Sequence, residues 1–212
     1  MELLKGIAAA LQAGDEEQTP VLIQQAVDSG IPAKQILDEG LITGMNRVGE
    51  LFRDQEIFLP DVLLAARAMY AGLAILKPLL LKAKIAPLGR IVIGSIQGDL
   101  HDIGKNLVGI MLQGAGFEVI DLGNDVAPER FVDTAVKEQA SIIGMSALLT
   151  TTMLNMKRVP ELLRDRGLTG AIKTVIGGAP VTAEYARKIG ADAYGYDAAN
   201  AVEVVKQLIG RA

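Results

Sequence analysis

The 212-residue chain contains no cysteine, no tryptophan and one histidine, His101. The lack of cysteine excludes a disulfide framework, thiolate zinc sites, cysteine-ligated iron–sulfur clusters and a catalytic thiol. A single histidine excludes any site that needs two imidazoles, such as an H-E-x-x-H zinc site. A serine–histidine–carboxylate triad would have to use His101, and no G-x-S-x-G motif supplies its nucleophile. Any imidazole chemistry in this protein therefore takes place at one position.

Clustered positive charge and long apolar runs are also missing. The 21 basic and 25 acidic side chains give a formal net charge of -4, and no Lys/Arg run typical of nucleic-acid binding occurs. The amino terminus lacks the apolar core of a signal peptide. The most apolar stretches, residues 73–81 and 91–96, are far shorter than the ~20 residues that span a bilayer. We therefore expect a cytoplasmic protein that binds neither nucleic acid nor a membrane.

The fold class predicted is α + α/β, beginning with a four-helix bundle over residues 1–86. Apolar residues recur at helical spacing in four stripes, at 3–11, 21–26, 36–52 and 59–80. Short turns containing glycine or proline separate the stripes. Leu59-Pro60 begins the last helix, because proline is accepted in a first turn. Four helices in roughly 80 residues are typical of an antiparallel bundle.

Residues 87–212 are predicted to form a Rossmann-like (flavodoxin-like) α/β domain with a five-stranded parallel sheet. Short apolar runs at 91–95, 117–123, 141–146 and 173–178, with a weaker one at 191–195, alternate with amphipathic segments. Ligands of such sheets bind beyond the carboxyl ends of the strands, near the point where the strand order reverses. We therefore expect function in the loops that follow Ser95, Leu122, Met145 and Ile176.

The loop after the first of these runs carries the only acid–imidazole pair. It is not a phosphate loop, because Asp99 and Asn106 stand where that pattern requires glycine and Ser/Thr. Asp99 and His101 are two residues apart, so in an extended segment they point to the same side, and the carboxylate can fix the imidazole tautomer. The pair suits a general base or a metal ligand, although a solvated histidine without a role is the plainer alternative. Since a conventional divalent-metal site needs three or four protein ligands, one histidine suffices only for a metal held in a macrocycle, haem or corrin.

Three motifs resemble the cobalamin-binding signature of methionine synthase and related corrinoid proteins. They are Asp99-x-His101-x-x-Gly104, Ser146-x-Leu148 and Gly177-Gly178, at intervals and strand ends that agree with that family. Upstream, residues 44–52 and 57–62 resemble the four-helix cap domain of methionine synthase. Residues 145–153 and the small size are more similar to the corrinoid proteins of anaerobic methyltransferase systems, which serve methanol, methylamines, betaines or aromatic methyl ethers. The resemblance covers the whole chain.

The resemblance implies a cofactor, cobalamin or a related corrinoid, that alternates between methylcob(III)amide and cob(I)amide. His101 would be the lower axial ligand of cobalt in place of the cofactor's own base. Asp99 would accept the other imidazole N–H, and Thr152, where methionine synthase has serine, would extend this relay. The protein would have no catalytic residue of its own. The remaining residues expected to contact the corrin or its nucleotide tail are Gly98, Asp102, Ile103, Gly104, Ser146, Leu148, Thr150, Gly177, Gly178 and Ala198, with Phe52, Leu59 and Val62 as shielding residues of the cap.

The function implied is that of a methyl carrier rather than a complete enzyme. A substrate-specific methyltransferase would methylate the corrinoid, and a second methyltransferase would pass the methyl group to tetrahydrofolate or a thiol acceptor, with a reductive activase as a further partner. The cap would have to move aside for these partners, which implies a hinge near residues 84–89. Two alternatives are a small subunit of an adenosylcobalamin-dependent mutase, which generally lacks the helical cap, and a cobalamin-based sensor, which normally carries a DNA-binding or signalling segment.

Overall fold

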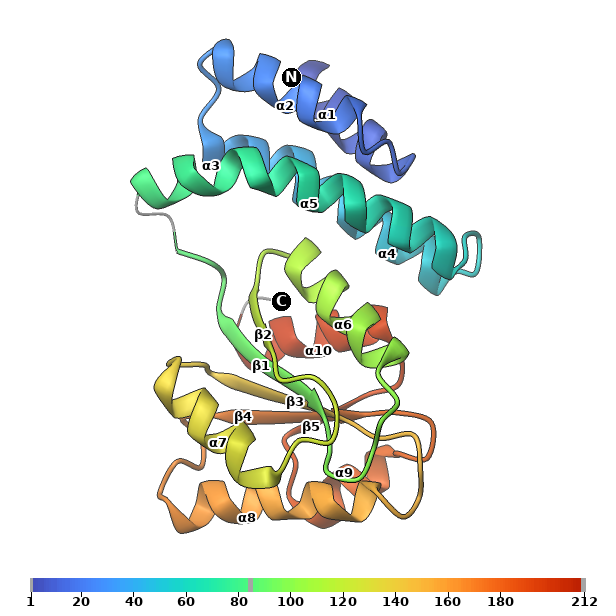
Figure 1. Cartoon of the computed structure of the whole chain (residues 1–212), viewed down its shortest axis with the longest axis vertical. Coiled ribbons are helices and arrows are strands. Elements are labelled where there is room, and N and C mark those ends of the chain that lie inside the picture. The colour runs from blue at the N-terminus through green and yellow to red at the C-terminus, as the bar shows by residue number, and fades with distance from the viewer. Residues whose placement is uncertain (1, 84–85, 211–212) are drawn as a thin grey trace. The chain divides into compact units, whose positions relative to one another are not determined.

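The computed structural model of the chain describes residues 2–83 and 86–210 (Figure 1). It divides into two compact units, one made of residues 1–87 with 114–116 and the other of the remaining residues. The sequence analysis places the domain boundary between residues 86 and 87. The hinge expected at 84–89 includes residues 84 and 85, which lie outside the described residues. Each unit is a structure in its own right.

The first unit is helical, and the four helices predicted from apolar spacing are present. Its elements are α1 (Glu2–Gln12), α2 (Gln18–Asp28), a continuous third helix composed of α3 (Ala33–Gln35), the π-helical η1 (Ile36–Ile42) and α4 (Thr43–Arg53), and α5 (Leu59–Lys82). Two glycines of the third helix lie against α1. A Cβ on Gly40 would lie 3.0 Å from Ile7 Cγ2, and one on Gly44 would lie 2.8 Å from the carbonyl oxygen of Ala8. The absence of these side chains therefore allows the two helices to approach closely.

Helix α5 is the core helix of this unit. Among the described residues it alone is long and apolar enough to cross a membrane by length and composition. Its buried residues include Val62, Ala65, Met69 and Leu76, which recur at helical spacing and form the stripe that an amphipathic helix buries in a bundle. A Cβ on Gly72 would lie only 2.6 Å from a side-chain carbon of α2, so α5 packs closely against that helix.

The second unit is a parallel α/β sheet flanked by helices, as predicted. Along the chain its elements are β1 (Arg90–Ser95), α6 (Ile103–Gly114), β2 (Glu118–Asp121), α7 (Pro128–Lys137), β3 (Ile142–Ser146), the 3-10 helix η2 (Met153–Lys157), α8 (Arg158–Asp165), β4 (Lys173–Gly177), α9 (Ala183–Ile189), β5 (Ala193–Gly195) and α10 (Ala198–Leu208). The strand order is β2-β1-β3-β4-β5 and every pairing is parallel. Helix α10 was not predicted, although Asp197 accepts a hydrogen bond from the N–H of Asn200 as its N-cap.

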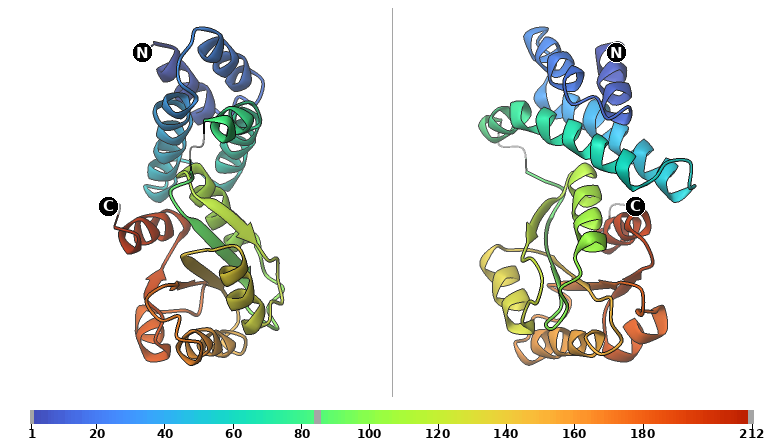
Figure 2. Two further views of the ribbon diagram at one scale, coloured as in Figure 1. Left: turned by 90° about the vertical axis from the view of Figure 1, so that its left-hand side faces the viewer. Right: turned by 45° about the vertical axis from the view of Figure 1, so that its right-hand side comes forward.

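Apolar helices cover both faces of this sheet. Side chains of β1, β3 and β4, such as Val92, Ile143 and Ile176, form one buried cluster with α7, α8 and α9, while α6 and α10 lie on the opposite face (Figures 1 and 2). The strand order reverses between β1 and β3, so the connections from these two strands leave to opposite faces and open a crevice at their carboxyl ends. The fold therefore places the loops after β1 and β3 where a ligand is expected.

Candidate cofactor site

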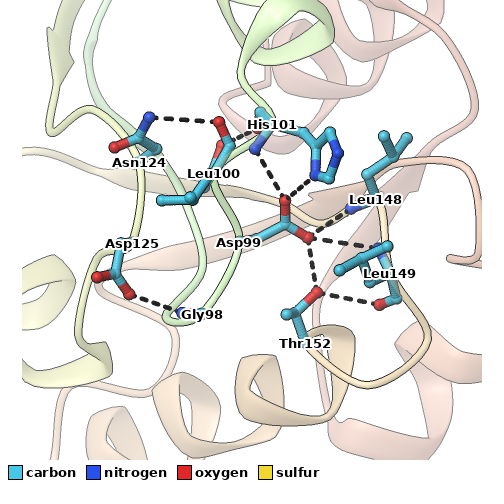
Figure 3. A network of polar contacts seen from close by, with 10 residues as sticks. Gly98, Asp99, Leu100, His101, Asn124, Asp125, Leu148, Leu149 and Thr152 are labelled. Atoms are coloured by element: carbon cyan, nitrogen blue, oxygen red, sulfur yellow. Dashed lines mark hydrogen bonds and ion pairs between the residues drawn. The ribbon is translucent and has the colours of Figure 1, made fainter.

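Asp99 lies in the loop that follows β1 and is fully buried. Its carboxylate is the centre of a polar network (Figure 3). One oxygen, Oδ1, accepts a hydrogen bond from the backbone N–H of His101 at 3.0 Å and faces the ring Nδ1 of His101 at 2.8 Å. The other, Oδ2, accepts from Thr152 Oγ1 at 2.6 Å and from the backbone N–H groups of Leu148 and Leu149 at 2.8 and 3.3 Å. The network thus joins the loop after β1 to the loop after β3.

The surroundings of Asp99 determine its charge. Burial by itself would raise the pKa of Asp99, since desolvation disfavours the charged form. The hydrogen bonds from Thr152, Leu148 and His101 act in the opposite direction and prevail, so the pKa of Asp99 lies well below its ordinary value. The carboxylate is therefore ionised at neutral pH and can only accept hydrogen bonds. A neutral His101 consequently carries its proton on Nδ1 and a lone pair on Nε2.

His101 combines a fixed tautomer with an accessible ring. Its side chain is 51% exposed, and within the described part of the chain Nε2 has no hydrogen-bond partner. A neutral imidazole whose Nδ1–H is held by a carboxylate is the arrangement of metal-ligating histidines. No three His, Asp or Glu side chains within residues 2–83 and 86–210 are grouped as a conventional metal site requires. The donor set therefore fits a metal that needs one protein ligand.

The surface around His101 is apolar, as contact with the flat face of a macrocycle would require. Leu100, Ile103 and Leu148 expose large apolar side chains beside the histidine, so apolar surface is gathered there. Gly104 lies in the first turn of α6, where glycine is unfavourable relative to alanine, and a Cβ built there meets nothing within 4 Å. Neither backbone conformation nor internal packing among the described residues requires glycine at position 104, and its contact with a cofactor stays a prediction.

The other residues expected to hold the cofactor tail lie along the same edge of the sheet. Ser146 of β3 and Gly177 of β4 are register partners, and Ser95 of β1, which was not among the expected residues, pairs with Ser146. Gly177 and Gly178 have an internal cause as well: a Cβ would lie 2.9 Å from the Gly195 carbonyl oxygen and 1.9 Å from the Ala147 carbonyl oxygen, respectively, and Gly178 has φ +120°. Contact of these glycines with a cofactor stays a prediction.

The remaining predicted residues differ in exposure. Thr150 is exposed and Asp102 is partly exposed, whereas Ala198 is buried as the first residue of α10. In the helical unit Phe52 and Leu59 are partly exposed, while Val62 is fully buried. The first two thus have surface to offer to a ligand, and Val62 contributes to packing.

Several residues of the site were missed by the sequence analysis. Ser95 Oγ donates to the His101 carbonyl oxygen at 2.6 Å, Asn124 Nδ2 to the Leu100 carbonyl oxygen at 3.3 Å and Asn155 Nδ2 to the Gln97 carbonyl oxygen at 3.0 Å. Asp125 Oδ1 accepts from the Gly98 N–H at 2.7 Å. These bonds hold the backbone of the loop that carries Asp99 and His101. Their position at or beyond the carboxyl ends of strands is the only signal in the sequence that could have indicated Ser95, Asn124 and Asp125, and nothing local indicates Asn155.

Gly104-Lys105 matches the Gly-Lys part of a phosphate loop, but the Lys105 side chain has a structural role. The side chain is almost fully buried, and Nζ lies 2.6 and 2.7 Å from the two carboxylate oxygens of Asp121 at the end of β2. The ammonium group is therefore committed to an ion pair within the fold and connects α6 to β2.

Comparisons with known proteins show the family to which the chain belongs. Two families described as B12 binding domains match residues 89–205 and 3–77. Trimethylamine corrinoid protein 2 of Methanosarcina acetivorans is 46% identical over 92% of this chain and 91% of that protein. The dimethylamine corrinoid protein of Methanosarcina barkeri is 44% identical over 98% of each chain.

A chain in the crystal structure of the methanol:cobalamin methyltransferase complex from Methanosarcina barkeri superimposes with a TM-score of 0.89 and 32% identity, covering 100% of this chain and 81% of that one. A cobalamin-binding protein from Desulfitobacterium hafniense superimposes with a TM-score of 0.80 and 31% identity, covering 97% and 98%. The fold, the lone histidine with its buried carboxylate and these similarities agree. The chain belongs to the family of corrinoid proteins, in which a helical unit precedes a Rossmann-like B12-binding domain.

Proposed function

We propose that this chain carries a methyl group on a corrinoid between two methyltransferases, and that His101 holds the cobalt. The observation that carries the proposal is the half-exposed ring of His101, whose Nε2 has no partner among the described residues and whose Nδ1 faces the buried, ionised Asp99. Membership of the corrinoid protein family supports the cofactor, and relatives named for trimethylamine, dimethylamine and a methanol methyltransferase complex support the carrier role. When bound, the corrinoid supplies a cobalt ion that takes up and releases a methyl group.

The protein's own contribution is to hold one imidazole in one state. Asp99 accepts the Nδ1–H, which keeps the lone pair on Nε2 and fixes the orientation of the ring. Thr152 and two backbone N–H groups hold Asp99 in turn, so the carboxylate does not turn away. Gly98, Asp102, Ile103, Gly104 and Leu148 would lie beside the ring, and the row that ends β3 and β4 would hold the tail with Thr150 and Ala198.

The helical unit would shield the reactive face, with Phe52 and Leu59 as the apolar contacts. Both side chains are partly exposed, so they have surface available for this purpose. Val62 would act one layer further inside, by supporting them. An apolar cover excludes water and oxidants from the site, and it would have to open to admit a partner.

The methyl donor we favour is a methylated amine. The relatives named for trimethylamine and dimethylamine share 44–46% identity with this chain, whereas the chain from the methanol:cobalamin methyltransferase complex shares 32%. As the acceptor of the second methyltransferase we propose tetrahydrofolate or a thiol, and a reductive activase would restore the reduced cofactor. The place of action would be the cytoplasm.

Anaerobic reconstitution tests the function directly. The purified chain is loaded with hydroxocobalamin, reduced, and mixed with a trimethylamine- or dimethylamine-specific methyltransferase and its amine. We expect one corrinoid per chain and methylation of that corrinoid in one equivalent, followed by absorption spectroscopy and by loss of one methyl group from the amine. A chain that binds the corrinoid but is methylated by no amine methyltransferase would contradict the amine donor, and failure with methanol, betaine and aromatic methyl-ether methyltransferases as well would contradict the carrier role.

A further inference from the structure

Two consecutive residues of the β2–α7 connection form hydrogen bonds with the loop that carries the histidine. Asn124 donates to the carbonyl oxygen of Leu100 at 3.3 Å. Asp125 binds the loop twice: its carboxylate accepts the Gly98 N–H at 2.7 Å, and its own N–H donates to the Asp99 carbonyl oxygen at 2.9 Å. Figure 3 shows both residues facing the loop.

The backbone of Asp125 is in the left-handed region, with φ +52°. This conformation is unfavourable for a residue with a side chain, although Asp and Asn tolerate it better than others. The left-handed turn aims the N–H and the carboxylate of one residue at the same loop. The fold therefore maintains an unfavourable backbone conformation at Asp125, and its two hydrogen bonds to the loop give this conformation a role.

Asn155 of η2 also forms a hydrogen bond with this loop. Its amide donates to the Gln97 carbonyl oxygen at 3.0 Å, and its backbone N–H donates to the Thr152 carbonyl oxygen at 3.0 Å. The start of η2 is tied to α9 by Tyr185, whose hydroxyl donates to the Met153 carbonyl oxygen at 2.7 Å. Asn155 thus connects the histidine loop to the same segment that presents Thr152 to Asp99.

We infer that Asn124, Asp125 and Asn155 are positioning residues that hold His101 in its metal-ready tautomer before any cofactor binds. The imidazole is half exposed and has one ring partner, so only the loop backbone and Asp99 fix its orientation. If the loop relaxes, the short bond from Nδ1 to Asp99 is lost, and the proton is free to move to Nε2. The inference rests on the proposed function, in which Nε2 is the ligand atom.

The test uses the apo-protein, because His101 is the only histidine and gives an unambiguous NMR signal. Nitrogen-15 spectra of the imidazole, recorded where the ring is neutral, report which nitrogen carries the proton. Asp125→Gly removes the acceptor without backbone strain, and Asn155→Asp replaces the donor with an acceptor facing the Gln97 carbonyl oxygen. Asp125→Asn keeps both an acceptor oxygen and tolerance of the left-handed turn, so it serves as the rescue variant.

We expect the wild-type protein, Asp125→Asn and the control Asp133→Asn, which breaks a surface ion pair with Arg166, to show the proton on Nδ1. In Asp125→Gly and Asn155→Asp the ratio of the Nδ1–H to the Nε2–H form should fall about tenfold, the effect of losing one net hydrogen bond. If Asn155→Asp does not fold, Asn155→Ala replaces it. Wild-type tautomer ratios in the folded Asp125→Gly and Asn155 variants would overturn the inference. A wild-type Nδ1–H tautomer combined with no cobalt–histidine bond in the loaded protein would instead overturn the ligand role and leave the positioning role intact.

Discussion

Two aspartates lie at opposite ends of the parallel strands of one sheet, Asp192 at the amino ends (the amino edge) and Asp99 at the carboxyl ends (the carboxyl edge). Their hydrogen-bond donors differ in kind. At the amino edge, Asp192 accepts from the backbone N–H and hydroxyl of Thr174 at 2.8 and 3.0 Å and from Lys173 Nζ at 3.0 Å. At the carboxyl edge, Asp99 accepts from a hydroxyl, backbone N–H groups and one imidazole, and among the described residues no lysine or arginine pairs with it.

The difference shows how one fold separates structure from chemistry. The Asp192 charge is balanced by the neighbouring Lys173, and its side-chain partners among the described residues lie in β4. Since Asp192 directly precedes β5, the group connects the starts of these two strands. The Asp99 carboxylate is stabilised by hydrogen-bond donors without a neighbouring lysine or arginine among the described residues. One of these donors is the ring of His101, which is half exposed. Burying a carboxylate without a neighbouring cation is costly unless hydrogen bonds compensate, and the group that Asp99 holds in this way is the one histidine of the chain.

The largest effect is expected from His101→Ala, because it removes the one ligand atom. Corrinoid retention should fall by about 100-fold or more, since even residues behind a ligand contribute 10–100-fold. The free energy of unfolding of the apo-protein should change by less than about 1 kcal/mol, since the side chain is half exposed. Equilibrium dialysis and urea denaturation measure the two quantities. Unchanged retention would remove His101 from the site.

Asp99→Asn separates the two edges of the sheet. The amide NH₂ would face the N–H of Leu148 and the hydroxyl of Thr152, so donors would oppose donors. We expect a loss of roughly 2–4 kcal/mol in the free energy of unfolding together with weaker corrinoid binding. Asp192→Asn should lower the free energy of unfolding by about 1 kcal/mol and leave corrinoid affinity unchanged. Equal effects of both variants on affinity would contradict the functional distinction.

The penalty of Asp99→Asn should also depend on pH. Because the folded-state pKa of Asp99 is depressed, its contribution to stability is fully present above the unfolded-state pKa of about 3.9 and is lost as the pH falls through the folded-state pKa. The difference in free energy of unfolding between wild type and Asp99→Asn should therefore be constant above about pH 5 and shrink below that. Urea titrations across this range measure it, and a difference that grows on acidification has the wrong sign.

Thr152 variants isolate the hydroxyl donor. Thr152→Val keeps the shape and removes the bond to Asp99 Oδ2, which should cost roughly 1.5–3 kcal/mol because the acceptor is a buried charge. Thr152→Ser retains the hydroxyl and should cost less than about 1 kcal/mol. Thermal unfolding of both variants provides the measurement, and equal losses would show that the methyl group matters rather than the hydrogen bond.

The smallest change in stability is expected at Gly104. Gly104→Ala should leave the apo-protein unchanged or more stable by up to ~1 kcal/mol, because the new Cβ enters open space on a helix. Corrinoid affinity should nevertheless fall by about tenfold or more, about 1.4 kcal/mol. The matched control Gly178→Ala should destabilise the fold by more than ~2 kcal/mol, since its Cβ meets a carbonyl oxygen at 1.9 Å. Undiminished affinity of Gly104→Ala would contradict a close cofactor contact.

The elements that position the site could be predicted from the sequence, whereas the bonds that complete it could not. Apolar periodicity predicts the strands that end at Ser95 and Ser146, and the pair Asp99 and His101 follows from their spacing. The hydrogen bonds from Asp125 and Asn155 to the loop depend on a left-handed turn and on loops that meet only in the folded chain. No local sequence pattern therefore predicts them. The π-helical segment over Ile36–Ile42 was likewise missed, since its apolar spacing is that of an ordinary helix.

The most direct test is electron paramagnetic resonance of the loaded protein in its cobalt(II) form, prepared with nitrogen-14 and with nitrogen-15 histidine. His101 is the only histidine, so the label marks a single ring. If Nε2 binds cobalt, the three-line nitrogen splitting of the unlabelled protein should become a two-line splitting in the labelled one. A three-line splitting that survives the label would come from the cofactor's own base, and no splitting in either sample would mean an absent lower nitrogen. Both results would contradict His101 as the ligand.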